Sequence, residues 1–207
     1  MKTKKVIFSL IIAALLWFFM FSNWTKELVN FWIMMPISGC ILTFLALLFG
    51  NKDIKEDIVF NKNMLIYGIV IAILLWFVFF IGDKIASFLF NFARSQVDNI
   101  YNLRTGTQKY IIGGLLLLII GPSEEIFWRG FIQKQLSKTC GKWQGFVFTL
   151  LIYTLIHLWS FNFMLAMAAM TAGFIWGLLY YFKPKWLLAL IISHAIWDCI
   201  VFVIFPI

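Results

Sequence analysis

The sequence predicts an all-α, polytopic transmembrane helix bundle of about seven spans, with its N-terminus inside, in a single membrane domain over residues 1–207. Of the 207 residues, 63% are hydrophobic, whereas soluble domains average about 45–50%. Charged residues make up 13%, about half the usual share of about 25%. The apolar residues also fall into seven runs, each close to the roughly 20 residues that a membrane span needs.

The seven runs give the predicted helices in chain order. They cover 6–22, 29–49, 64–81, 110–133, 143–160, 163–182 and 186–206. The first run follows a lysine-rich start, but it is longer than the apolar region of a signal peptide and no small-x-small cleavage site follows it. We therefore interpret it as a span. The fourth run contains Gly121-Pro122, where the missing proline N–H predicts a kink or a new helix start.

Segment 82–109 is more polar than its neighbours but keeps apolar residues such as Ile85 and Phe88. This mixture predicts an amphipathic interfacial helix followed by a loop. With the N-terminus inside, eleven basic residues fall in inner segments and five in outer ones, as the positive-inside rule requires. Four of those five lie in 82–109, and an extra spanning element there would reverse the topology of the helices before it.

Composition also excludes some classes of function. The net charge of +8 fits membrane topology, because no basic cluster is dense enough for a nucleic-acid interface. The three cysteines are far apart and lack C-x-x-C spacing, so they predict neither a disulfide nor a zinc finger. The compact, Lys/Ile/Phe/Asn-rich chain favours a bacterial plasma-membrane protein.

A charged motif interrupts the fourth run, where each charge is costly in hydrocarbon. Glu124 and Glu125 are neighbours on a helix and about 100° apart, so both cannot point into one small cavity. Arg129 lies four residues after Glu125, a usual ion-pair spacing. We predict that Glu125 pairs with Arg129, which offsets part of their burial cost, and that Glu124 is free for chemistry. A packing clasp of all three is the alternative.

Both histidines of the chain lie in predicted spans. Tyr153 and His157 share a helix face, where a lone histidine would serve as an interhelical hydrogen-bond partner. His194 and Asp198 share a face of the last helix. The carboxylate can accept from one ring nitrogen, fix the tautomer and aim the other nitrogen. A purely structural pair is the alternative.

Glu124, His157, His194 and Asp198 lie on three predicted helices and can converge on one water. A glutamate or histidine can accept its proton, while a second group stabilises the oxyanion. Glu124, His157 and His194 could instead hold Zn²⁺. A proton- or ion-coupled transporter would also use such residues as a relay, although the sequence has no inverted repeat or paired broken helices.

These residues resemble the CPBP family, which comprises CAAX-type prenyl-protein endopeptidases and bacteriocin-processing or immunity proteins. The resemblance rests on three ordered motifs: E-E-x-x-x-R at 124–129, aromatic-x-x-x-H at 153–157 and H-x-x-x-D/N at 194–198. It covers about 110–203, which we take as the catalytic core. Residues 1–109 form N-terminal helices of unknown role.

The resemblance implies a membrane-embedded endopeptidase in which Glu124, with His157, activates water. His194 and Asp198 would stabilise the oxyanion or join a metal site. Asp198 stands where some members have asparagine. Because an ionised aspartate is a poor oxyanion donor, this favours a protonated Asp198, an orienting role toward His194, or a metal.

The resemblance also implies roles for the neighbouring charged residues and a set of partners. Glu125 and Arg129 would support the site. The family is commonly labelled as metalloproteases, yet a metal-free glutamate mechanism is also argued, so Zn²⁺ stays open. Implied partners are the lipid bilayer and a peptide or membrane-anchored protein, prenylated or not. Peptide-signal processing, bacteriocin maturation and a non-catalytic bacteriocin immunity protein are further readings.

The predicted topology also gives a direction for the site. Glu124 follows a span that would run from the outer to the inner side, and Lys134, Lys138 and Lys142 follow soon after it. We therefore expect a polar cavity open to the inner side.

Overall fold

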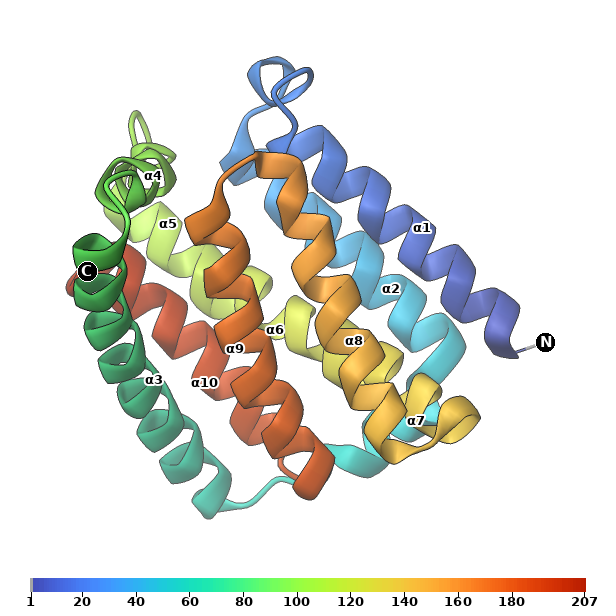
Figure 1. The fold of residues 1–207 in the computed structure, drawn as a ribbon. Coiled ribbons are helices and arrows are strands. Elements are labelled where there is room, and N and C mark those ends of the chain that lie inside the picture. Colours follow the sequence, from blue (N-terminus) through green and yellow to red (C-terminus); the bar gives the residue numbers. More distant parts are fainter. Residues whose placement is uncertain (1) are drawn as a thin grey trace.

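A computed structural model describes residues 2–207 as an all-helical bundle (Figure 1). The α-helices are α1 (Lys2–Phe21), α2 (Phe31–Asp57), α3 (Lys62–Leu89), α4 (Ala93–Asn102), α5 (Lys109–Leu115), α6 (Gly121–Glu125), α7 (Lys134–Cys140), α8 (Lys142–His157), α9 (Phe163–Phe182) and α10 (Leu187–Cys199). Three further stretches, Leu116–Ile120, Ile126–Gln133 and Ile200–Ile204, are π-helical. The first two join α5, α6 and α7 into one continuous helical path.

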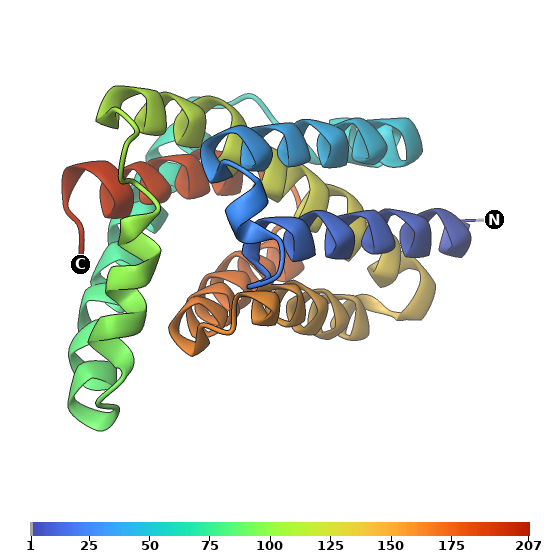
Figure 2. The same ribbon diagram turned by 90° about the horizontal axis from the view of Figure 1, so that it is seen from above.

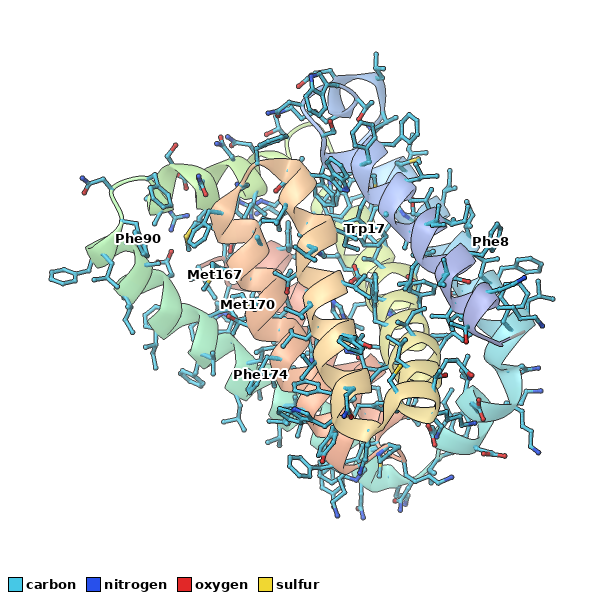
Figure 3. All side chains as sticks on the ribbon, turned by 45° about the vertical axis from the view of Figure 1, so that its right-hand side comes forward. Phe8, Trp17, Phe90, Met167, Met170 and Phe174 are labelled. Atoms are coloured by element: carbon cyan, nitrogen blue, oxygen red, sulfur yellow. The ribbon has the colours of Figure 1, made fainter. Side chains whose placement is uncertain are left out.

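Seven helical stretches are long and apolar enough to cross a membrane, which confirms the predicted number of spans. They are Thr3–Phe21, Phe31–Asp57, Lys62–Leu89, Lys109–Cys140, Lys142–Ser160, Phe163–Phe182 and Leu187–Ile204. Large apolar side chains such as Phe8 and Phe174 are exposed on the outside of the bundle (Figure 3). Such an apolar exterior suits contact with lipid, so the chain is a multi-pass integral membrane protein.

Two predicted helix ends lie well before the observed ones. α2 runs to Asp57 rather than ending at 49. α3 runs to Leu89 rather than ending at 81, because apolar residues continue past Asp83 and this carboxylate meets Arg94 of α4 (Oδ1–Nη1, 3.4 Å). The predicted amphipathic segment contains α4, followed by turns up to the start of α5. At Gly121-Pro122 the helical path is unbroken but changes from π-helical to α-helical, and π geometry accommodates a disrupted hydrogen-bond ladder.

The packing of α10 places the polar residues of the bundle side by side. α10 lies against α3 along its length and against α6, while α8 pairs with α9 (Figure 1). Seen from above, α4 runs beside α3 on the side of the bundle away from α1 (Figure 2). Gly121 permits the contact of α6 with α10, since a Cβ there would lie 2.7 Å from the backbone nitrogen of Ala195. This close approach brings Glu124 and Glu125 next to the histidine of α10.

Candidate active site

The two neighbouring glutamates of α6 point in different directions, as their helical spacing predicts. Glu124 lines a cavity, whereas Glu125 lies outside the cavity wall and is fully buried. Glu124 is also buried, with 6% of its surface exposed. The pair therefore places one carboxylate in a cavity and the other within the protein.

Glu125 is the centre of a buried charge cluster. Arg129 Nη1 donates to Glu125 Oε1 at 2.7 Å, which is the predicted i, i+4 contact. His194 Nδ1 lies 2.9 Å from the same oxygen. Arg129 Nη2 donates in addition to the carbonyl oxygen of Gly173 at 3.3 Å. Because a carboxylate accepts hydrogen bonds from both neighbours, Glu125 is held by two side chains and not by Arg129 alone.

His194 is therefore fixed from two sides. Its ring stacks on Trp176 with centroids 3.9 Å apart, and its Nε2 lies 3.5 Å from Asp198 Oδ2. The sequence predicted the His194–Asp198 pair but separated it from the Glu125–Arg129 pair. The structure joins the two pairs into one chain of charges, because α6 and α10 touch at Gly121.

Tyr153 of α8 connects Glu124 with His157. Its hydroxyl donates to Glu124 Oε2 at 2.7 Å. Its backbone carbonyl lies 2.7 Å from His157 Nδ1. The motif spacing pointed to Tyr153 as an aromatic residue, but its partner on another helix is visible only in the structure.

His157 has a second partner that the sequence did not indicate. The indole Nε1 of Trp17, in α1, donates to His157 Nε2 at 3.2 Å. Trp17 is fully buried. A tryptophan within a generic apolar run carries no sequence signal for such a contact.

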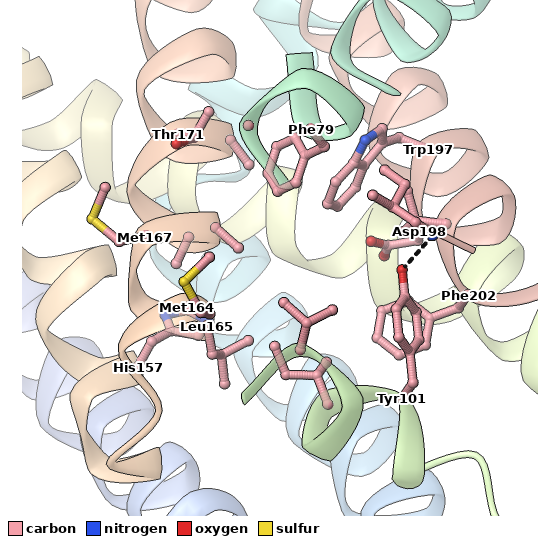
Figure 4. A pocket seen from close by; sticks show the side chains of 18 of the residues that line it. Phe79, Tyr101, His157, Met164, Leu165, Met167, Thr171, Trp197, Asp198 and Phe202 are labelled. Carbon is pink, nitrogen blue, oxygen red and sulfur yellow. Dashed lines mark hydrogen bonds between the residues drawn. The ribbon is translucent and has the colours of Figure 1, made fainter. Parts of the chain in front are cut away.

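A cavity of about 330 Å³ meets this cluster. Glu124, Tyr153, His157, His194 and Asp198 form one polar cluster in its wall; Asp83, Tyr101 and Thr171 are also polar, and most of the remaining lining is apolar. Figure 4 shows Phe79, Trp197 and Phe202 on one side of the cavity, and Met164, Leu165 and Met167 of α9 on the other. A buried carboxylate thus lies in the wall of a cavity suited to apolar groups.

The cavity does not lie beside Lys134, Lys138 and Lys142, as the sequence led us to expect. Its lining includes the first residues of α2, the last residues of α3, and Tyr101 of α4, all at the end of the bundle that the topology prediction called outer. Lys134, Lys138 and Lys142 instead line a separate pocket. Glu124 lies midway along Lys109–Cys140, and the residues of that stretch that line the cavity with it, Leu116 and Ile120, come before it in the chain. Burial raises the pKa of the Tyr101 hydroxyl in this lining, and the hydroxyl oxygen accepts the backbone N–H of Ile207.

The predicted zinc ligands do not fit a metal in this arrangement. Both ring nitrogens of His157 have partners, and those of His194 face two carboxylates. Within residues 2–207, no three or more His, Cys, Asp or Glu side chains are grouped to hold a metal ion. His157 and His194 would have to exchange these partners before they could bind Zn²⁺ together with Glu124.

The part of the chain that contains this polar cluster matches a known protein family. Residues 106–200 match the family model described as type II CAAX prenyl endopeptidase Rce1-like, which confirms the resemblance that the three motifs indicated. Glu124, Tyr153, His157, His194 and Asp198 all fall inside the matched region, whereas Trp17 lies outside it. No curated protein and no solved structure matches the chain.

Proposed function

We propose that this protein is an intramembrane endopeptidase that cleaves membrane-associated peptides or proteins, because residues 106–200 match the model of the type II CAAX prenyl endopeptidase Rce1-like family. The observation that supports this most is the carboxylate of Glu124, buried in the wall of an apolar cavity beside two histidines. Glu125 and Arg129 neutralise one another, so Glu124 is the carboxylate available to the cavity.

In this proposal Glu124 is the general base. Tyr153 holds its Oε2, so the other oxygen, Oε1, would accept the proton of a water in the cavity. The water oxygen attacks the peptide carbonyl carbon, and the proton passes from Glu124 to the leaving amine as the C–N bond breaks. General acid–base catalysis of this kind contributes roughly 10²- to 10⁴-fold to a rate.

His194 is the proposed donor to the oxyanion. Its Nδ1 faces the Glu125 carboxylate and its Nε2 faces the Asp198 carboxylate; because carboxylate oxygens accept hydrogen bonds, this geometry suits a ring with a proton on each nitrogen. The Nε2–H faces Asp198 at 3.5 Å, which is too long for a strong hydrogen bond. With the ring held by Trp176 and Glu125, this weakly engaged Nε2–H is available to the developing negative oxygen of a substrate, where one such donor is worth roughly 10²- to 10³-fold. Asp198 then orients His194, a role that the carboxylate allows.

The lining of the cavity suggests the substrate class. Methionine and aromatic side chains of α3, α9 and α10 surround the polar groups, and such surfaces adapt to varied apolar ligands. We propose a peptide whose cleavage site lies next to a lipid anchor or an apolar segment. The family description suggests a prenylated CAAX tail as one such substrate. Apolar bacteriocin precursors and peptide signals are the other candidate substrates.

The same geometry supports a metal-free mechanism. A metal at either ring nitrogen of His157, or at Nδ1 of His194, would displace a protein partner. Glu124, Tyr153 and His194 supply a base, a hydroxyl that orients it and an oxyanion donor without a metal.

The proposal is tested by reconstituting the protein in lipid vesicles and presenting three peptides: a farnesylated peptide ending in CAAX, the same peptide without the lipid, and an amphipathic bacteriocin precursor. Mass spectrometry of the products should show one new C-terminus in at least one peptide. Glu124→Ala should abolish that product. Vesicles that leave every peptide intact but carry a Glu124-dependent proton flux would overturn the endopeptidase in favour of a transporter.

A further inference from the structure

We propose that Trp17 is a positioning residue that holds His157 as a neutral imidazole with its proton on Nδ1, so that Glu124 alone takes the proton of the water. This inference rests on the proposed endopeptidase function. It also assigns a role to α1, which lies outside the region that matches the family.

The contact is well enclosed. Trp17 is fully buried and His157 is 6% exposed. The indole lies edge-on to the His157 ring with centroids 5.9 Å apart, and edge-on to Trp128 at 6.5 Å. Among residues 2–207, the cavity wall includes His157 but not Trp17, so the indole reaches the histidine from behind the wall.

The partners of His157 determine its tautomer. Nδ1 faces the Tyr153 carbonyl at 2.7 Å, and a carbonyl oxygen can only accept, so Nδ1 carries the proton. Nε2 faces the indole N–H of Trp17 at 3.2 Å, and an indole N–H can only donate, so Nε2 presents its lone pair. Both contacts are satisfied by the neutral ring in one tautomer.

A proton on Nε2 would break this arrangement. The charged ring has two N–H donors, so Nε2–H would point at the indole N–H and the hydrogen bond would be lost in a site with little access to water. Buried donors left without an acceptor are costly. His157 is therefore disfavoured as the proton acceptor, and the carboxylate of Glu124, which lines the cavity, takes that role.

The first test does not depend on any substrate. The protein is labelled with ¹⁵N-histidine in lipid nanodiscs, and the two histidines are told apart by the loss of one signal set in His157→Gln. We expect His157 to show a protonated Nδ1 and an unprotonated, hydrogen-bonded Nε2. Trp17→Phe should shift the Nε2 resonance.

Trp128→Phe is the matched control for this measurement. Trp128 is equally buried and lies in the same cluster, but within residues 2–207 its indole nitrogen has no hydrogen-bond partner. Its replacement should leave the Nε2 resonance of His157 in place. A protonated Nε2 in the wild-type protein, or the same resonance in Trp17→Phe as in Trp128→Phe, would overturn the proposal.

The second test uses the peptide that the wild-type protein cleaves. A glutamine at 157 carries an amide oxygen near the position of Nε2 and can accept from Trp17, so His157→Gln should keep at least about fivefold more activity than His157→Ala, the worth of one net hydrogen bond. That advantage should vanish when Trp17→Phe is added. Equal activity of the Gln and Ala variants would refute the positioning role. If no peptide is cleaved at all, the endopeptidase proposal fails, while the nitrogen spectra still decide the role of Trp17.

Discussion

Removing the guanidinium of Arg129 is expected to destabilise the bundle by about 3–5 kcal/mol, the usual cost of leaving one partner of a buried ion pair alone. In Arg129→Met, Glu125 keeps only its contact with His194 at 2.9 Å and loses the Arg129 contact at 2.7 Å. The change also removes the guanidinium from above the rings of Tyr153 and Trp176. Both members of the pair are at most 2% exposed, so water cannot replace the lost partner.

Arg94→Met is the matched control, because Arg94 also forms ion pairs, with Asp83 and Asp98. The Arg94 side chain is 45% exposed, and its buried partner Asp83 keeps Lys84 at 3.7 Å, so the loss of Arg94 should cost no more than about 1 kcal/mol. The free energies of unfolding can be measured by reversible unfolding in mixed micelles of SDS and a mild detergent. The two variants should differ by about 2 kcal/mol or more, a roughly 30-fold difference in the unfolding equilibrium. Equal, small losses for both would refute the idea that the Glu125–Arg129 pair is shielded from water.

The remaining predictions concern the geometry around Glu124. Tyr153→Phe removes the hydroxyl from Glu124 Oε2 and should lower kcat by roughly tenfold, as expected for a hydrogen bond to a charged group, with little change in KM for the cleaved peptide. Gly121→Ala should destabilise the protein by about 1–3 kcal/mol in a thermal melt, because the new Cβ would lie 2.7 Å from the backbone of Ala195. Gly114→Ala is the control and should leave the stability unchanged, because nothing lies within 4 Å of its Cβ. A chelator such as 1,10-phenanthroline should leave peptide cleavage unchanged, and inhibition that added Zn²⁺ reverses would refute the metal-free mechanism.

Much of the fold follows from the sequence because lipid imposes simple rules. A span needs about 20 apolar residues, so the seven runs could be counted directly, and the start and end of α9 were predicted to the residue. The contact between Glu125 and Arg129 also follows from local spacing, because residues four apart meet on any helix.

The contacts between helices could not be predicted in this way. Glu125 reaches His194 because Gly121 lets α6 touch α10, and nothing in the spacing of either motif encodes that approach. Trp17 lies 140 positions before His157 in a run whose apolar pattern is generic. The direction of the cavity depends on how the helices are packed around Glu124, and the distribution of lysines reports only on the helix ends.

Turnover by Glu124→Gln tests the proposed endopeptidase most directly. The variant keeps the size of the side chain and an oxygen that can accept from Tyr153, but it lacks the basic carboxylate. In vesicles, its kcat for the cleaved peptide should fall by roughly 10²-fold or more. Glu27→Gln, an exposed glutamate in the turn Lys26–Leu28, should match the wild-type rate. A folded Glu124→Gln protein that cleaves the peptide at the wild-type rate would contradict the assignment of Glu124 as the base.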